Sequence, residues 1–282
     1  MSTANFLFLD GQIHRSNKLL VSPNNRSFRY GDGFFETMKW MNGRVLLADY
    51  HFERLFTSLD RLQFQAPNYF TKAYLENQIN ELVKKNGHTK LARVRVMIYR
   101  GEGGLYDVEN HFPHHLIQTY ELNPSNNQLN ENGLVVDLYR DAIKVCDSFS
   151  HIKSNNYLNY AMAAIWAKKQ HLNDAFLFNP YNRLADATIA NVFLIKDGFI
   201  KTPAITEGPV QGVMRRHLLQ ALRAADMPVE ETTIELADIE QASEIFLTNA
   251  IYGIRWVKQF GKHTYTQQLA PLLHKKMVQS SF

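Results

Sequence analysis

The chain has little cysteine and no long apolar run, and each of these absences excludes a class of protein. Cys146 is the single cysteine among 282 residues, which excludes an intrachain disulfide and a metal cage built from several cysteines. No stretch approaches the roughly 20 consecutive apolar residues of a membrane-spanning helix. The short apolar run at 6–9 also lacks the preceding basic residues of a signal peptide. We therefore expect a cytoplasmic protein that has no metal site and does not enter a membrane.

The chain also lacks a strong excess of charge. Its net charge is +4, and 21% of its residues are charged. Nucleic-acid-binding proteins usually cluster Lys and Arg on one surface, whereas here the cations are scattered among carboxylates. The small surplus would suit an anionic small substrate, although a solvated surface is the simpler explanation. We expect a small-molecule partner and no nucleic acid.

One change of composition divides the chain. Hydrophobic residues make up 45% of the sequence, enough for one large domain or two of average size. The stretch ELNPSNNQLNENG, at 121–133, is rich in Asn and has little to bury. It predicts a link between a domain at 1–120 and a second domain at 134–282.

Hydrophobic periodicity predicts mixed secondary structure in both parts. FLFLDG and GRVLLAD have the character of short strands, while 49–64 and 74–85 repeat apolar residues at helical spacing. ARVRVMIYR alternates strictly and predicts a strand with Arg95 on its polar face. In the second part, 156–169 and the segment after Gly212 predict helices, and 175–179, 190–203 and 244–249 predict strands. Helices and strands do not alternate regularly, so we expect two α+β domains.

Two separated segments carry cationic groups that could take part in catalysis or bind a cofactor. Lys153 lies in IKSNNYL between an apolar residue and an Asn pair. Partial burial there would lower the pKa of its amine and favour a nucleophile that forms Schiff bases. Arg54 lies in HFERL at the edge of the apolar stripe of its helix. Its guanidinium suits a phosphate, although an ion pair or a solvated head group is the simpler interpretation.

Two further segments could complete a site. In GPVQGVMRR, Gly212 precedes a predicted helix, so the amides of Val213 and Met214 would be helix-N-terminal donors of the kind that bind phosphate. In LADATIANVFLI, Asp186 lies among apolar residues at what we expect to be the end of a loop. It either faces solvent in a turn or binds a protonated ring nitrogen, which would keep that ring cationic.

Taken in order, these segments resemble the class IV aminotransferases, the fold type IV pyridoxal-phosphate enzymes. The resemblance covers nearly the whole chain, through RSFRYGDGFFETMKWMNG, HFERL, YRGEGGLY, KSNNYL, DATIANVFLIKDG, GPVQGVMRR and ASEIFLTNAIYGI. It implies a two-domain fold like that of D-amino acid aminotransferase, with pyridoxal 5'-phosphate as cofactor. The family builds its sites at a dimer interface, so the resemblance also implies a homodimer.

Carried onto this sequence, the resemblance implies a role for each matching residue. Lys153 becomes the Schiff-base lysine and proton shuttle, carried by the second domain. The implied cofactor-binding residues are Arg54, Tyr157, Asp186, Gly212, Val213, Met214, Asn249 and Ala250. Asp186 departs from the family's usual Glu, which shortens the reach of the carboxylate by about 1.5 Å.

The resemblance leaves the reaction open between two chemistries. Phe35, Thr37, Arg95 and Arg100 are the implied substrate-binding residues. Thr37 is typical of the aminodeoxychorismate lyases, whereas Arg95 and Arg100 could each bind the carboxylate of a small amino acid or 2-oxo acid. Phe35 stands where D-amino acid aminotransferases have Tyr, so that carboxylate site is incomplete. We expect an aminotransferase, with a pyruvate-releasing 4-amino-4-deoxychorismate lyase as the alternative and a weakly catalytic or non-catalytic scaffold as the third.

Overall fold

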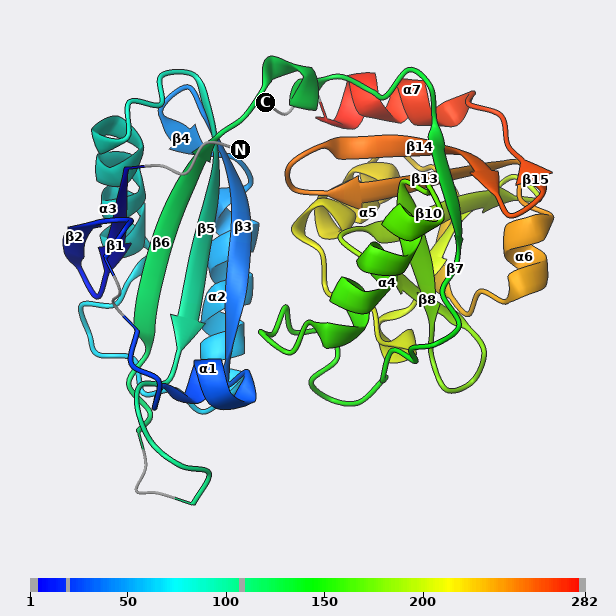
Figure 1. The fold of residues 1–282 in the computed structure, drawn as a ribbon. Coiled ribbons are helices and arrows are strands. Elements are labelled where there is room, and N and C mark those ends of the chain that lie inside the picture. Colours follow the sequence, from blue (N-terminus) through cyan, green and yellow to red (C-terminus); the bar gives the residue numbers. More distant parts are fainter. Residues whose placement is uncertain (1–4, 19–20, 107–109, 279–282) are drawn as a thin grey trace. The chain divides into compact units, whose positions relative to one another are not determined.

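The computed structural model describes residues 5–18, 21–106 and 110–278 (Figure 1). The chain mixes helices and strands, which confirms the α+β prediction. It forms two compact units: unit 1 is Met1–Pro124 with Lys153–Asn156, and unit 2 is Ser125–Ile152 with Tyr157–Phe282. The link at 121–133 and a lysine carried by the second domain stay predictions, and in the structure Lys153–Asn156 packs with unit 1.

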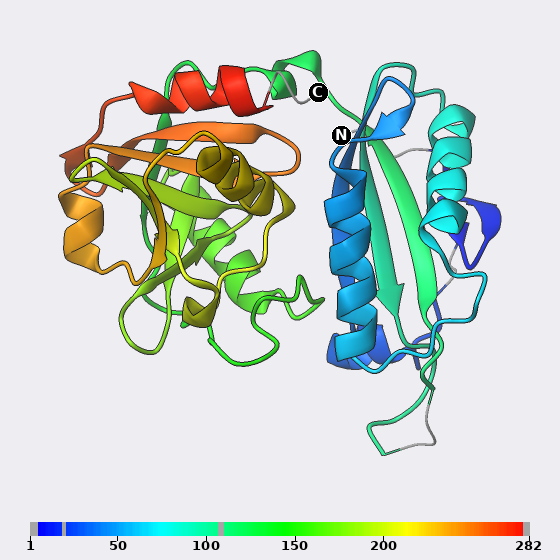
Figure 2. The same ribbon diagram turned by 180° about the vertical axis from the view of Figure 1, so that it is seen from behind.

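Unit 1 is built on one sheet covered by helices. In the described residues, its strands lie in the order β2-β1-β6-β5-β3-β4, with neighbours antiparallel. Helix α2 packs on β3, and α3 packs on β1 and β6, as Figure 2 shows. The elements of this unit are β1 (Phe6–Leu9), β2 (Gln12–Arg15), α1 (Arg26–Tyr30), β3 (Gly33–Met41), β4 (Arg44–Val45), α2 (Ala48–Arg61), α3 (Lys72–Lys85), β5 (Leu91–Tyr99) and β6 (His114–Glu121).

Alternation along β3 separates the two faces of this sheet. Phe34, Glu36 and Met38 point toward the helices and are almost fully buried. Phe35 and Thr37 therefore point to the opposite face. Because cross-strand partners share a face, the pairing of Thr37 with Arg95 places Arg95 on that face too. On β3, the Glu36 carboxylate therefore points toward the helices, and the substrate-binding candidates Phe35 and Thr37 lie on the other face of the sheet.

Unit 2 is built on a larger mixed sheet. In the described residues its strand order is β12-β11-β10-β13-β14-β7-β8-β9, with β15 added beside β14. Helix α4 packs on β8, and α5 packs on β12 and β13. The elements are β7 (Leu134–Leu138), α4 (Leu158–Lys169), β8 (Asp174–Phe178), β9 (Leu184–Ala187), β10 (Asn191–Lys196), β11 (Phe199–Pro203), α5 (Val213–Ala224), β12 (Val229–Thr232), α6 (Leu236–Glu240), β13 (Glu244–Asn249), β14 (Gly253–Phe260), β15 (His263–Thr264) and α7 (Leu269–Leu273).

Several predictions from periodicity are confirmed, and others need correction. Helices α2, α3 and α5 and strand β5 lie where apolar spacing placed them. The strand expected over GRVLLAD is only Arg44–Val45, because α2 already begins at Ala48. Asp186 is not at the end of a loop: it lies inside β9 and is 2% exposed. In the described residues, none of the helices has both the length and the apolar character that a membrane crossing requires.

Candidate active site

Lys153 is held against the edge of β3 by its own backbone. The backbone N–H of Phe35 donates to the Lys153 carbonyl at 3.0 Å, and Asn155 N–H donates to the Gly33 carbonyl at 2.9 Å. The approach is close: a Cβ at Gly33 would lie 2.7 Å from Nδ2 of Asn155 and 2.3 Å from the carbonyl oxygen of Ile98. Glycine at position 33 therefore lets the lysine segment dock as an extra partner of β3.

The side chains of Lys153 and Arg95 meet at one aromatic ring. Nζ of Lys153 lies 4.8 Å from the centroid of the Phe35 ring, and Cζ of Arg95 lies 3.9 Å from the same centroid. Both distances are within the range of cation–π attraction. Thr37 is the cross-strand partner of Arg95. Unit 1 thus brings three predicted site residues, Lys153, Arg95 and Thr37, to the face of the sheet that carries Phe35.

Arg54 forms part of a buried ionic cluster with Glu36 and His51. Its Nε donates to Oε1 of Glu36 at 2.7 Å, and its Nη2 donates to Oε2 at 2.6 Å. Nδ1 of His51 is 2.7 Å from the same Oε2. Because His51 and Arg54 are three residues apart on α2, they lie on one face of the helix. The paired guanidinium has a fixed orientation, and Nη1 is the terminal nitrogen that this bidentate pair does not use.

The protonation states in this cluster follow from burial and charge. Burial alone would raise the pKa of Glu36, but Arg54 and His51 outweigh it and lower that pKa to about 2. Burial lowers the pKa of His51; Glu36 opposes this effect, while the positive charges of Arg54 and Lys153 add to it. A neutral His51 therefore donates from Nδ1 to the Glu36 carboxylate. Its Nε2 is a buried acceptor without a hydrogen-bond partner among the residues described.

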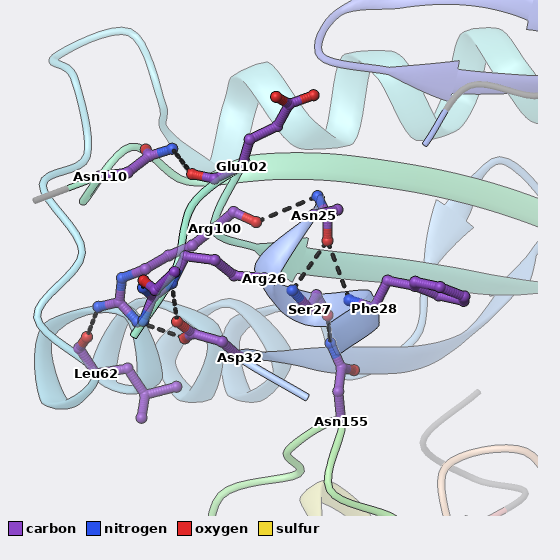
Figure 3. A network of polar contacts seen from close by, with 11 residues as sticks. Asn25, Arg26, Ser27, Phe28, Asp32, Leu62, Arg100, Glu102, Asn110 and Asn155 are labelled. Carbon is purple, nitrogen blue, oxygen red and sulfur yellow. Dashed lines mark hydrogen bonds and ion pairs between the residues drawn. The ribbon is translucent and has the colours of Figure 1, made fainter. Parts of the chain in front are cut away.

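Arg100 belongs to a different network of unit 1 (Figure 3). Its Nη1 donates to Oδ1 of Asp32 at 2.5 Å, and its Nη2 donates to the Leu62 carbonyl. Arg26 binds the other oxygen of Asp32 at 2.8 Å. The guanidinium of Arg100 also stacks on the ring of Phe64 at 4.3 Å. Arg100 thus binds Asp32 and the Leu62 carbonyl, while Arg95 lies against the Phe35 ring. The two arginines predicted to bind a carboxylate therefore have different surroundings.

In unit 2, the N-terminus of α5 supplies backbone donors. Gly212 is the N-cap, and no side chain caps the helix. The first helical hydrogen bond runs from Arg216 N–H to the Gly212 carbonyl at 2.9 Å. The amides of Val213 and Met214 are therefore first-turn donors at the positive end of the helix dipole. Such donors are suited to a phosphate group.

Asp186 is held by neutral donors on both of its oxygens. Oδ1 accepts from Nδ2 of Asn191 at 3.0 Å, and Oδ2 accepts from the N–H of Val210 at 2.9 Å. The hydroxyl of Tyr160 is 3.3 Å from Oδ2. Burial first, and Asp186 and Tyr157 next, raise the pKa of Tyr160, so this hydroxyl keeps its proton and donates it. These hydrogen bonds favour the ionised form of the carboxylate.

The remaining predicted residues of unit 2 lie near this carboxylate or at the end of β13. The Tyr157 hydroxyl donates to the Thr188 carbonyl at 2.9 Å, and its ring centroid lies 4.5 Å from that of Tyr160. Oδ1 of Asn249 accepts from the N–H groups of residues 251 and 252, at 3.0 and 2.9 Å. Asn249 thus shapes the turn that contains Ala250. Contacts of Tyr157, Asn249 and Ala250 with a cofactor stay predictions.

Three residues of these clusters were not predicted from the sequence. Glu36 is a carboxylate within an apolar run, and a carboxylate that is buried in such a run needs a polar partner. His51 precedes Arg54 by one helical turn, which was a usable signal. Asn191 offered no signal, because a polar residue five positions after Asp186 does not show that its side chain joins Asp186 to Val210.

The donors present suit pyridoxal phosphate on physical grounds. A phosphate dianion requires fixed cationic and amide donors, and each unit carries one such group: the guanidinium of Arg54 in unit 1 and the first-turn amides of α5 in unit 2. A pyridinium nitrogen requires an ionised carboxylate, and the hydrogen bonds to Asp186 favour that state. An aldehyde requires an amine, which Lys153 can supply.

Comparison with known proteins identifies the class to which these groups belong. The family model described as amino-transferase class IV matches residues 33–260. The chain belongs to the class IV aminotransferases. Members of this family are pyridoxal-phosphate-dependent enzymes, so this chain is a class IV pyridoxal-phosphate enzyme.

The relatives include more than one activity. An aminodeoxychorismate lyase of Bacillus subtilis is 27% identical over 293 residues, covering 97% of this chain and 95% of the relative. A D-alanine aminotransferase of Listeria innocua is 24% identical over 256 residues, covering 88% and 85%. The crystal structure of a branched-chain aminotransferase from Thermoproteus uzoniensis with norvaline has a TM-score of 0.88 at 21% identity, covering 98% of this chain and 94% of that one. This structural likeness confirms the fold, while the relatives leave the reaction divided between transfer and elimination.

Proposed function

We propose that the chain is an aminotransferase that moves an amino group between a small amino acid and a 2-oxo acid, using Lys153. The observation that carries this proposal is the pair of cations at Phe35. Lys153 supplies an amine 4.8 Å from the ring centroid, and Arg95 supplies a carboxylate-binding guanidinium 3.9 Å from it. An α-amino acid has a carboxylate and an α-hydrogen on neighbouring atoms, and these two side chains suit that pair of groups.

The side chains divide the work of the reaction. When bound, pyridoxal phosphate supplies an aldehyde that condenses with amines and a ring that accepts electrons. Arg54 and the amides of Val213 and Met214 bind the phosphate, and Asp186 holds the ring nitrogen in its protonated form. Nζ of Lys153 would hold the aldehyde end of the cofactor, and the same amine would carry a proton from the substrate α-carbon. Arg95 orients the substrate by its carboxylate.

The alternative is a lyase that releases pyruvate from 4-amino-4-deoxychorismate. Thr37 supports this function, because it is the cross-strand partner of Arg95 on the face that carries Phe35. A hydroxyl at that position could hydrogen-bond to a polar ring substituent of the substrate. Lys153 would serve both reactions, so the surroundings of the substrate decide between them.

A single-turnover absorbance experiment on the holoenzyme tests these functions. We would mix it with each of a panel of L- and D-amino acids and with 4-amino-4-deoxychorismate, and follow the spectrum of the bound cofactor. Conversion to the pyridoxamine spectrum by one amino acid is the expected result, and it also names the donor. Pyruvate release with the starting spectrum restored after each cycle would establish the lyase. No spectral response to any compound would support the non-catalytic scaffold.

We also infer a homodimer, supported by the exposed side of α4. Leu158, Met162 and Ile165 lie at helical spacing and are 72%, 43% and 61% exposed. An apolar stripe of this kind on a helix is typical of an interface. Sedimentation should show a dimer that Ile165→Glu weakens and that Lys84→Glu, at an exposed position of α3, leaves intact. A monomeric wild-type chain would contradict this inference.

A further inference from the structure

One buried amide joins two of the groups described above. Asn191 is the first residue of β10 and is 5% exposed. Its Nδ2 donates to Oδ1 of Asp186 at 3.0 Å and to the carbonyl of Val210 at 2.8 Å. A single side chain thereby connects strand β9 to the loop that leads into α5. Both hydrogens of an amide NH₂ are needed for these two bonds, and Asn supplies them.

Three hydrogen bonds close a ring. Val210 N–H donates to Oδ2 of Asp186 at 2.9 Å, while the Val210 carbonyl accepts from Asn191. Asn191 in turn donates to Oδ1 of Asp186. Each of the three residues therefore binds the other two. Because the ring is buried, opening any of its bonds leaves a desolvated polar group, which fixes the position of the carboxylate.

The same asparagine also sets the start of α5. A Cβ built at Gly212 would lie 1.8 Å from Oδ1 of Asn191, closer than any real Cβ contact. Gly212 has φ −64° and ψ 134°, which other residues adopt readily. The backbone conformation therefore does not require glycine there, whereas contact with Asn191 does. Asn191 thus touches the residue that precedes the phosphate-suited amides of α5.

We propose that Asn191 is a positioning residue that holds the Asp186 carboxylate and the N-terminus of α5 in one fixed arrangement. This inference rests on the proposed function, in which Asp186 binds the ring nitrogen and α5 binds the phosphate. Both anchors would then bind one cofactor molecule, so their position relative to each other affects its affinity.

The first experiment tests whether Asn191 couples Asp186 to the N-terminus of α5 or affects only one of these two groups. We would remove the cofactor and titrate the apoenzyme with pyridoxal phosphate and, separately, with inorganic phosphate. Asn191→Ala should raise the Kd for pyridoxal phosphate about tenfold and change the Kd for inorganic phosphate by less than about twofold, because phosphate alone uses one anchor. An equal change in both constants, or no change in either, would overturn the inference.

Thr202→Val is the matched control for the loss of a buried hydrogen bond. Oγ1 of Thr202 donates to the Val192 carbonyl at 2.8 Å, one residue further along β10. This variant should lower the melting temperature and leave the Kd for pyridoxal phosphate unchanged. If Thr202→Val weakens cofactor binding as much as Asn191→Ala does, the effect of Asn191 is only structural and the inference fails.

A second pair of variants keeps the test decisive if Asn191→Ala folds poorly. Gly212→Ala should weaken pyridoxal-phosphate binding, because the new methyl group collides with Asn191. Asn191→Ala added to Gly212→Ala should restore part of the affinity. A harmless Gly212→Ala, or a double variant as weak as the sum of the two, would overturn the proposed contact. A wild-type chain that binds no pyridoxal phosphate would instead overturn the proposed function together with this inference.

Discussion

The two units hold their buried carboxylates in different ways. In unit 1, Glu36 is bound by the guanidinium of Arg54 and the imidazole of His51. In unit 2, Asp186 accepts hydrogen bonds from three neutral groups, an amide, a backbone N–H and a hydroxyl, and its charge also acts on the buried ammonium of Lys144. A carboxylate held by a cation balances that cation, whereas one held by dipoles keeps its charge for a further partner. Glu36 is therefore suited to orient Arg54, and Asp186 is suited to bind a cationic ring.

The difference also ranks the expected effects of substitution. Removing a cation from a buried ion pair leaves an uncompensated charge, whereas removing a neutral donor leaves a carboxylate with one hydrogen bond fewer. Substitutions in the cluster of unit 1 should therefore cost more stability than those around Asp186. Lys153 stands apart, because its removal affects chemistry more than folding.

The largest expected effect is on turnover. Lys153→Ala should abolish it, since Nζ of Lys153 is the amine that we propose to bind the aldehyde and carry the proton. Borohydride reduction of the wild-type holoenzyme should attach the cofactor to the peptide that contains Lys153, as mass spectrometry can show. Lys196→Ala, which removes a surface ion pair with Asp238, is the control. Substantial turnover by Lys153→Ala would contradict the assignment.

Arg54→Ala should produce the largest loss of stability. It leaves Glu36 buried without its main cation, which costs about 3 to 5 kcal/mol in the free energy of unfolding. The affinity for pyridoxal phosphate should fall as well. Adding Glu36→Gln should recover stability, as measured by urea unfolding, without recovering cofactor affinity. Recovery of both properties would show that Arg54 serves the fold alone.

The ion pair of Glu36 with Arg54 should also make the stability of the wild-type chain fall at acid pH. Arg54 and His51 lower the pKa of Glu36 from 4.5 to about 2 against the effect of burial, so the folded state binds the proton more weakly than the unfolded state does. The resulting stability is complete above pH 4.5 and is lost as the pH falls toward 2. It amounts to about 3 kcal/mol. Glu36→Gln should be less stable at neutral pH, and its unfolding free energy should change less over this range.

The smallest expected effect concerns the neutral donors of unit 2. Tyr160→Phe removes the 3.3 Å hydrogen bond to Asp186 and should cost about 1 kcal/mol of stability. Backbone and amide donors still bind both oxygens of the carboxylate. Urea unfolding of Tyr160→Phe beside Arg54→Ala tests the comparison directly. A larger loss in Tyr160→Phe would reverse the proposed difference between the units.

The sequence predicted those elements whose pattern is local. Helix α5 and its glycine, helix α2 with Arg54, and the alternating strand β5 follow from spacing and turn residues alone. Strand β3 was not predicted, because residues of both faces are buried and GFFETMKWM shows no clean alternation. Asp186 was misplaced in a loop because the turn-forming residues around it suggested one. Periodicity cannot show that a short segment is a strand buried on both faces.

For the site, the sequence predicted which residues take part better than it predicted which of them contact one another. Lys153 and Arg95 were both proposed, but their meeting at Phe35 depends on the register of β3 and β5 and on the docking of a segment more than 100 residues away. Arg100 has the same chemistry as Arg95 and a different set of contacts. The sequence position of an arginine does not show which distant groups its guanidinium contacts in the fold.

The segment that carries Lys153 has a second consequence for the molecule. The first half of β3 pairs with β5 on one side, and on the other side with Lys153–Asn156, not with a full strand. Without those four residues, that side would expose unpaired N–H and C=O groups, which recruit strands from other chains. A fragment that ends at residue 124 would therefore be prone to aggregate. Residues Lys153–Asn156 thus cover the edge of β3. Selection for chemistry and selection against aggregation therefore act on the same four residues.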